Sequence, residues 1–200
     1  SMHCDAIVAA AESYIGLVEV GVGVIPGGGG TKEFALRVSD SFFEGDVQMP
    51  TLIKYFKTIA MGQVATSALE AFEFGYMIEN RDEVSVNGPM NISGAKSKVI
   101  EMSKKYIPLN PRTDIHVLGQ SGLATLYTAS NELKRGNWAS EHDIKIAHKL
   151  ANVMCGGPLS APQKVSEQYL LDLEREAFLS LCGEQKTLER IQHMIQYNNP

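Results

Sequence analysis

The sequence predicts a mainly α-helical protein with a short β segment near its N-terminus. The first observation is an apolar stretch with few charges at residues 6–24, which leads toward four consecutive glycines. The second is that most of the chain beyond these glycines places apolar residues three or four positions apart, the spacing of one helix face. The expected helical share is well above that of an average soluble domain.

Composition indicates a globular protein. The chain has 200 residues, of which 44% are hydrophobic and 20% charged, with a formal net charge of −5. No basic face dominates, so nucleic acid is not expected as a partner. The sequence contains neither an apolar run long enough to span a bilayer nor the pattern of a secretory signal, so no membrane partner is expected.

The three cysteines point to a reducing compartment. Cys4, Cys155 and Cys182 are few, odd in number and far apart, which is typical of free thiols in a cytoplasmic protein. No C-x-x-C occurs, and the spacing of His142 and His148 is poor for one helix face, so no metal site is expected.

The N-terminal apolar stretch is expected to begin with a buried strand. Asp5–Ala10 reads as that strand, and Tyr14–Val24 as short apolar segments around one carboxylate, Glu19. Such a strand needs neighbours in a sheet, yet few strand candidates follow it. We therefore expect its partner strands to belong to sequence upstream of this chain.

The glycines permit sharp turning and close approach of the backbone to a neighbour or ligand. Pro26 leads into Gly27–Gly30, and Thr31 is expected to cap a helix over about residues 32–38. Further elements are then expected in this order: a helix over about 50–65 that opens at Pro50, a helix over 67–74 that ends at Gly75, a strand over 83–87, and helices over about 92–106 and 120–135, the last ending at Gly136.

Two sequence patterns predict where the later helices begin. Ser140 and Asp143 form a capping box, and Ser160–Gln163 reads as a second one. The helix after the second box carries an apolar stripe, which is typical of core or of a subunit contact, and ends at Gly183. A last helix follows. The stripe consists of Leu170, Leu173, Ala177, Phe178 and Leu181.

Glu19 is the most informative single residue. A carboxylate buried among valines and glycines loses hydration, which raises its pKa and suits it to proton transfer near neutral pH. Taken from the local sequence alone, a carboxylate exposed at a bend is the favoured interpretation, because isolated carboxylates usually reach solvent. A dinucleotide-binding fingerprint is the weaker alternative, because Gly21-x-Gly23 has the wrong spacing to Gly27 and Pro26 stands where the helix should begin.

Two segments resemble the crotonase family of enoyl-CoA hydratases and isomerases. The segment from Glu19 to Thr31 resembles the family's Glu-(apolar/Gly)-Gly-x-Ile-Pro-Gly-x-Gly-Gly-Thr stretch, which supplies one active-site glutamate. Ser67–Met77 resembles the helix that normally follows the core of that fold. The resemblance implies that residues 1–80 are the C-terminal part of an α/β crotonase-like core and that residues 81–200 form a helical extension.

Three further segments resemble a narrower group, the bacterial 3-hydroxyacyl-CoA dehydrogenases. These are Gly16–Gly23, His142–Ala147 and Ser166–Phe178, and together the similarities cover nearly the whole chain. In that group the NAD-binding dehydrogenase domains come first and a crotonase-like module comes last. The resemblance implies an N-terminally truncated module, with no cofactor in this chain and NAD held by the upstream domains.

The resemblance also assigns site residues. It makes Glu19 catalytic and places Gly16, Pro26, Gly27 and Gly28 beside an acyl-CoA or enoyl-CoA thioester. The family's Gly-Gly-Gly-x-Glu segment, which carries a second glutamate and an oxyanion-hole amide, does not occur in this sequence. We therefore expect the chain alone to be inactive or nearly so, and its expected partners are the thioester, the upstream dehydrogenase domains and a second copy in a homo-oligomer.

A different class of function also fits the helical extension. Residues 81–200 could act without catalysis, as a docking or oligomerisation module, in which case charged substitutions at Leu173 and Phe178 should disturb assembly or stability. Four lysines on the helix expected over 92–106 could meet coenzyme A phosphates, but a solvated helix face is the favoured interpretation. They are Lys96, Lys98, Lys104 and Lys105.

Overall fold

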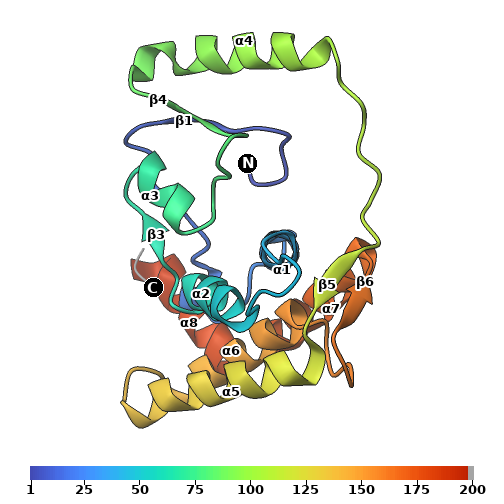
Figure 1. Ribbon diagram of the computed structural model, residues 1–200. Coiled ribbons are helices and arrows are strands. Elements are labelled where there is room, and N and C mark those ends of the chain that lie inside the picture. Colours follow the sequence, from blue (N-terminus) through green and yellow to red (C-terminus); the bar gives the residue numbers. More distant parts are fainter. Residues whose placement is uncertain (198–200) are drawn as a thin grey trace. The chain divides into compact units, whose positions relative to one another are not determined.

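The computed structural model describes residues 1–197, and it divides into two compact units (Figure 1). Unit 1 comprises Ser1–Gly16 and Val64–Asn110, and unit 2 comprises Leu17–Gln63 and the chain from Pro111 onward. Helices dominate and the strands are few and short, which confirms the prediction of a mainly helical chain. Each helix among residues 1–197 is too short or too polar to cross a bilayer.

Unit 1 is built from two small sheets and two helices. Its elements are β1 (Val8–Ala10), β2 (Ile15–Gly16), β3 (Val64–Ala65), α3 (Ala68–Glu73), β4 (Glu83–Ser85), the 3-10 turn η2 (Gly88–Met90) and α4 (Asn91–Ser103). β1 pairs with β4 in parallel, with Ala9 opposite Val84, and β2 pairs with β3 antiparallel. The predicted strands over residues 5–10 and 83–87 are thus confirmed, although each is only three residues long.

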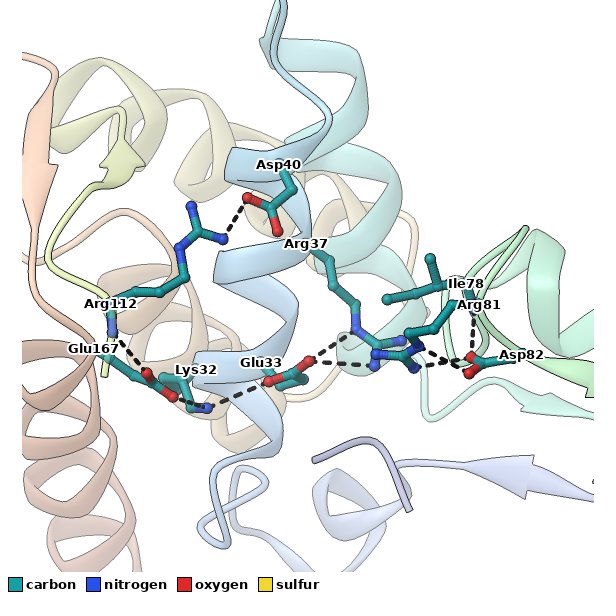
Figure 2. Close-up of polar contacts among 9 residues, drawn as sticks. All are labelled: Lys32, Glu33, Arg37, Asp40, Ile78, Arg81, Asp82, Arg112 and Glu167. Atoms are coloured by element: carbon teal, nitrogen blue, oxygen red, sulfur yellow. Dashed lines mark hydrogen bonds and ion pairs between the residues drawn. The ribbon is translucent and has the colours of Figure 1, made fainter. Parts of the chain in front are cut away.

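A buried aspartate fixes the start of the parallel pair in unit 1. The side chain of Asp82 is fully buried and accepts hydrogen bonds from the backbone amides of Ile7 (2.9 Å) and Ile78 (2.7 Å) and from the guanidinium of Arg81 (Figure 2). Burial raises the pKa of Asp82, but these hydrogen bonds outweigh it, so that the pKa lies below its usual value. The ionised carboxylate therefore holds the segment before β1 against the turn before β4.

The predicted start of α3 is also confirmed. Ser67 has an extended backbone, and its hydroxyl accepts a hydrogen bond from the amide of Glu70. Just past the end of the helix, Gly75 adopts a φ of 81°, which is accessible to glycine without strain.

Unit 2 is a helical bundle that carries one small two-stranded antiparallel sheet. Its elements are η1 (Glu19–Val22), α1 (Gly30–Asp40), α2 (Met49–Ala60), β5 (Ile115–Val117), α5 (Gly119–Arg135), α6 (Glu141–Met154), β6 (Gln163–Val165), α7 (Glu167–Cys182) and α8 (Gln185–Tyr197). Helix α6 packs against α1, α2, α5 and α7, and β5 lies against α1. One core cluster joins α1, β5 and α7 through four buried residues: Ala35, Ile115, Val117 and Leu170.

One predicted capping box is confirmed and the other is wrong. Ser140 and Asp143 cap α6 reciprocally, as expected. Residues 163–165, by contrast, form β6, which pairs antiparallel with β5. Helix α7 begins only at Glu167, where the hydroxyl of Ser166 accepts a hydrogen bond from the amide of Tyr169. The strand pairing satisfies the backbone of residues 163–165 across the sheet, and this tertiary arrangement overrides the local helix signal.

Two other boundaries differ from expectation. Thr31 does not cap α1, because the helix already begins at Gly30 and the Thr31 hydroxyl donates to the carbonyl of Pro26. Helix α2 ends at Ala60, several residues before position 65, because Gly62 turns the chain with a φ of 55°.

The compact units and the predicted modules divide the chain differently. Each unit contains residues from both sides of position 80, since unit 1 runs on to Asn110 and unit 2 begins at Leu17. Units in space and family modules in sequence are separate properties, so the assignment of residues 1–80 and 81–200 to different modules stays a prediction.

Candidate functional site

Glu19 opens the 3-10 turn η1 in unit 2. The residue is half-buried, and its Oε2 atom is shielded from solvent without a hydrogen-bond partner among the described residues. Its neighbours in the sequence are Val18 and Val20, and the turn closes when Gly23 adopts a φ of 94°. A shielded carboxylate oxygen with no donor is costly to the fold and can accept a proton or hydrogen bond from a ligand. Glu19 is thus neither fully exposed nor fully buried, with one of its two carboxylate oxygens shielded.

The glycine-rich turn is shaped by close contacts within unit 2. A β-carbon at Gly27 would overlap the aromatic ring of Phe178 on α7, and one at Gly30 would lie 2.9 Å from Cβ of Pro26 and 3.2 Å from Cδ1 of Leu17. Gly28 is different, because it is exposed and a β-carbon there would meet nothing within 4 Å. Close packing therefore requires glycine at positions 27 and 30 but not at 28.

The N-terminus of α1 is capped from a distant helix. Glu174 on α7 is 1% exposed, and its carboxylate accepts hydrogen bonds from the backbone amides of Gly29 (2.6 Å) and Lys32 (2.8 Å). Burial raises the pKa of Glu174, and the backbone hydrogen bonds work in the opposite direction. The anion that a helix N-terminus attracts is thus supplied by the protein itself, which argues against a phosphate-binding glycine loop at this turn.

Charged side chains lock α1 to α7 and to the strand that precedes α5. Lys32 is 4% exposed, and its Nζ atom lies 3.3 Å from Glu33 and 2.6 Å from Glu167 (Figure 2). Glu33 in turn pairs with Arg37 at 3.3 Å. The other carboxylate oxygen of Glu167 accepts from the backbone amide of Arg112, just before β5. These contacts between protein groups make the network a structural brace for the turn.

The predicted site residues fall in both units. Glu19, Pro26, Gly27 and Gly28 belong to unit 2, whereas Gly16 is an exposed residue that ends β2 in unit 1. Pro26 is buried, so its part is to shape the turn, while Gly27 and Gly28 reach solvent.

Three supporting residues were not predicted from the sequence. Glu174 and Phe178 on α7 support the glycine-rich turn, and Thr187 on α8 supports the turn that carries Glu19. A signal for Glu174 was present, because it lies four residues after Leu170 and three before Ala177 and thus on the apolar face of α7. A carboxylate on the apolar face of a helix predicts that a buried hydrogen-bond donor or cation pairs with it.

An apolar cavity adjoins the Glu19 turn in unit 2. It has a volume of about 230 Å³ and is bounded by Val20 and Gly21 of the turn, by Phe56 on α2 and by Ile144 on α6, with Arg190 at its edge. A cavity of this size and lining can take a short hydrocarbon group.

Two of the remaining polar candidates, His142 and His148, contact other side chains of unit 2. His142 contacts Thr187, and the ring of His148 stacks on Tyr127 with 4.0 Å between centroids. Within residues 1–197, no three His, Cys, Asp or Glu side chains gather in a way that could hold a metal ion. Of the four lysines near α4, Lys98 pairs with Glu83.

Comparison with known proteins places the chain near enzymes of fatty acid oxidation. It is 42% identical over 194 residues to a Bacillus subtilis (strain 168) protein provisionally named 3-hydroxyacyl-CoA dehydrogenase, a match that covers 97% of the chain and 24% of that protein. It is 30% identical over 197 residues to a Rickettsia felis protein provisionally named fatty acid oxidation complex trifunctional enzyme, with 98% of the chain and 24% of that protein covered. A Rickettsia prowazekii protein with the same provisional name is 28% identical over 195 residues.

The chain spans about a quarter of the length of these relatives. No family model matches it.

Proposed function

We propose that the chain is part of a fatty-acid β-oxidation enzyme that acts on acyl-CoA thioesters, and that Glu19 is its proton-transfer group. Two independent observations support the proposal. Relatives named for fatty acid oxidation and for 3-hydroxyacyl-CoA dehydrogenase match almost the whole chain. The buried Oε2 of Glu19 lacks a partner in the described residues, and this is the observation that carries the site assignment.

The proposed chemistry is proton transfer next to the thioester. In hydration, the Glu19 carboxylate takes a proton from water as the water oxygen bonds to C3 of the 2-enoyl group, the C2–C3 π electrons move into the thioester enolate, and the proton is then delivered to C2. In isomerisation, the same oxygen removes a proton from one substrate carbon and returns it to another. The apolar cavity beside Val20 and Gly21 accommodates hydrocarbon, and Gly27 and Gly28 present exposed backbone near the turn.

Other parts of the reaction would come from outside these residues. Stabilising the thioester enolate needs oxyanion-hole donors, each of which contributes about 3–4 kcal/mol where measured. The family's Gly-Gly-Gly-x-Glu segment, which carries one such donor, does not occur in this sequence. We therefore propose that the chain alone hydrates crotonyl-CoA far more slowly than a longer polypeptide that supplies these donors. NAD would bind in dehydrogenase domains of that polypeptide.

The test is a glutamine at position 19 in a complete polypeptide that contains this sequence. Glu19→Gln preserves size but removes the base, so the rate of loss of the crotonyl-CoA enoyl absorbance should fall by about 10²–10⁴. Glu12→Gln is the matched control, because Glu12 is exposed in unit 1. A Glu19→Gln enzyme with the rate of the Glu12→Gln control would refute the assignment.

A specific observation favours docking as a second function of the helical part. Helix α4 buries no residue, and its side chains Ile92, Val99 and Ile100 are 84%, 65% and 53% exposed. An apolar cavity of about 500 Å³ lies between α4 and the segment that contains β1. A helix with this much exposed apolar surface is typical of one that another polypeptide segment or a second copy covers.

The docking surface is therefore expected on α4 and not on α7. Leu173 packs on the core cluster of unit 2, and Phe178 lies against Gly27, so that charged substitutions there should unfold unit 2. Ile92→Asp and Val99→Asp should instead leave the circular dichroism spectrum intact and lower the mass of any complex in sedimentation. If the sedimentation coefficient of the complete polypeptide stays unchanged, α4 is not the docking surface.

A further inference from the structure

The turn that carries Glu19 has little support of its own. It is a single 3-10 turn of four residues, without a side-chain cap and without a buried residue. Its internal hydrogen bonds run from the amides of Gly21 to Val18 (2.9 Å), of Gly23 to Val20 (3.1 Å) and of Val24 to Glu19 (3.2 Å). One such turn is marginal, because 3-10 hydrogen bonds have poorer geometry than those of an α-helix. Its position must be fixed by contacts from elsewhere.

Helix α8 supplies these contacts through a buried threonine. Thr187 is 0% exposed, and its hydroxyl donates to the carbonyl of Gly23 at 2.8 Å, directly after the Glu19 turn. The same oxygen lies 2.9 Å from Nε2 of His142 on α6. A hydroxyl has one proton, and Thr187 uses it in the hydrogen bond to the Gly23 carbonyl. Nε2 of His142 must therefore be the donor in the second hydrogen bond. The hydrogen bonds from His142 to Thr187 and from Thr187 to Gly23 thus form a chain that runs in one direction, called the relay below.

The approach of α8 to the turn is close enough to require glycine. A β-carbon on Gly23 would lie 2.8 Å from Oγ1 and 2.9 Å from Cα of Thr187, and the φ of 94° at Gly23 is itself unfavourable for other residues. One helical turn further along α8, Arg190 donates to the carbonyl of Val20 at 3.4 Å and pairs with Asp143 at 2.7 Å. Two residues on one face of α8 therefore hold the turn, at Val20 inside it and at Gly23 just after it.

We propose that Thr187 is a positioning residue for Glu19: by fixing the carbonyl of Gly23 it sets where the Glu19 carboxylate meets the thioester. This inference rests on the proposed function of Glu19. It assigns α8 a task in the reaction, carried out through the turn that holds Glu19. Both the neutral form of His142 that donates from Nε2 and the imidazolium carry a proton on Nε2, so the relay does not depend on which of them is present.

The experiment compares variants of Thr187 in a complete polypeptide that contains this sequence, with crotonyl-CoA as substrate. Thr187→Val keeps the shape and removes both hydrogen bonds, whereas Thr187→Ser keeps them. Misplacement of a catalytic group by about 1 Å costs up to about 10²-fold in rate. We therefore expect kcat of Thr187→Val to fall about 10-fold or more with KM little changed, and kcat of Thr187→Ser to recover most of the loss. Gln185→Ala, an exposed neighbour on α8, is the control for general effects on the helix.

The outcomes separate this inference from the function on which it rests. If Glu19→Gln lowers kcat but Thr187→Val and Thr187→Ser have equal kcat, Thr187 does not position Glu19. If Glu19→Gln itself has no effect, the proposed function fails first. Should Thr187→Val not fold, His142→Phe removes only the donor to Thr187 and leaves the bond to Gly23 in place. That variant should lower kcat several-fold relative to Gln185→Ala, and an unchanged kcat would overturn the relay.

Discussion

The backbone amide of Gly29 donates a hydrogen bond to Glu174, a residue 145 positions later in the sequence. The second oxygen of the same carboxylate accepts from Lys32, so that one side chain on α7 caps the first turn of α1. Glycine 29 has a φ of 88°, and no side chain of its own segment caps the helix. The glycine turn thus depends on α7 for the hydrogen bonds that a local cap would otherwise supply.

Removal of this carboxylate should destabilise unit 2 strongly. Glu174→Ala leaves two backbone amides buried without an acceptor, each at a cost of about 1–3 kcal/mol, so the free energy of unfolding should fall by roughly 2–6 kcal/mol. Glu174→Gln keeps one acceptor oxygen and should lose less. Urea denaturation measures the effect, with Glu176→Ala on the exposed face of α7 as the control. Equal midpoints for the alanine variants at 174 and 176 would contradict the capping role.

The contact between Gly27 and Phe178 can be tested by adding one methyl group. Gly27→Ala places a β-carbon into the phenyl ring and should lower the free energy of unfolding by about 1–3 kcal/mol, as is usual for overpacking. Gly28→Ala enters open space and should have little effect. In a double-mutant cycle, Phe178→Leu should recover part of the loss caused by Gly27→Ala. Strict additivity of the two substitutions would show that the side chains are not in contact.

His148 should make stability depend on pH in the mildly acidic range. Burial lowers the pKa of His148 below its ordinary value of 6.5, and its Nε2 has no partner among the described residues. As the pH falls below 6.5, the unfolded chain binds a proton on His148 more readily than the folded chain does, so the free energy of unfolding decreases. Well above 6.5 this contribution is constant. His148→Phe keeps a ring against Tyr127 and should reduce the slope of stability against pH below 6.5. An unchanged slope would assign the dependence to other groups.

The cysteines should differ sharply in their reaction with a disulfide reagent. Cys4 is exposed, whereas Cys155 is fully buried, and burial raises the pKa of its thiol to about 12. The thiolate is the reactive form, so Cys155 should react only after the protein unfolds. Mass spectrometry after a brief treatment of the native protein should find label on Cys4 and none on Cys155. Rapid labelling of Cys155 without denaturant would show that α5 and α6 open readily.

Local chemistry predicted those elements whose determinants are close in sequence. The capping box of Ser140 and Asp143, the cap at Ser67 and the stop of α5 at Gly136 each involve residues within a few positions, and each is found. The strand β5 was not predicted because its pattern is only three residues long, with Ile115 and Val117 buried around His116. The start of α7 was misplaced because residues 163–165 pair with β5, which lies about 50 positions earlier in the sequence.

For the candidate site, the sequence predicted the carboxylate but not what holds it. Glu19 stood out because it is a lone charge in an apolar run, and the structure finds it half-buried with one shielded oxygen. Phe178, which packs on the glycine-rich turn, and Thr187, which holds the end of the Glu19 turn, look like ordinary members of amphipathic helices. Their role arises only from the packing of α7 and α8 on the turn, which depends on tertiary contacts and on no local pattern.

The order in which a ribosome makes this chain adds a consequence to the discontinuous units. All of unit 1 has been synthesised once Asn110 leaves the tunnel, but unit 2 still lacks Glu174, Phe178 and Thr187 at that point. Until they are made, the nascent α1 lacks its cap, and the segment around Glu19 lacks the helix that fixes it. Residues 17–63 must therefore wait, partly formed and exposed to chaperones and proteases, until α7 and α8 have been synthesised.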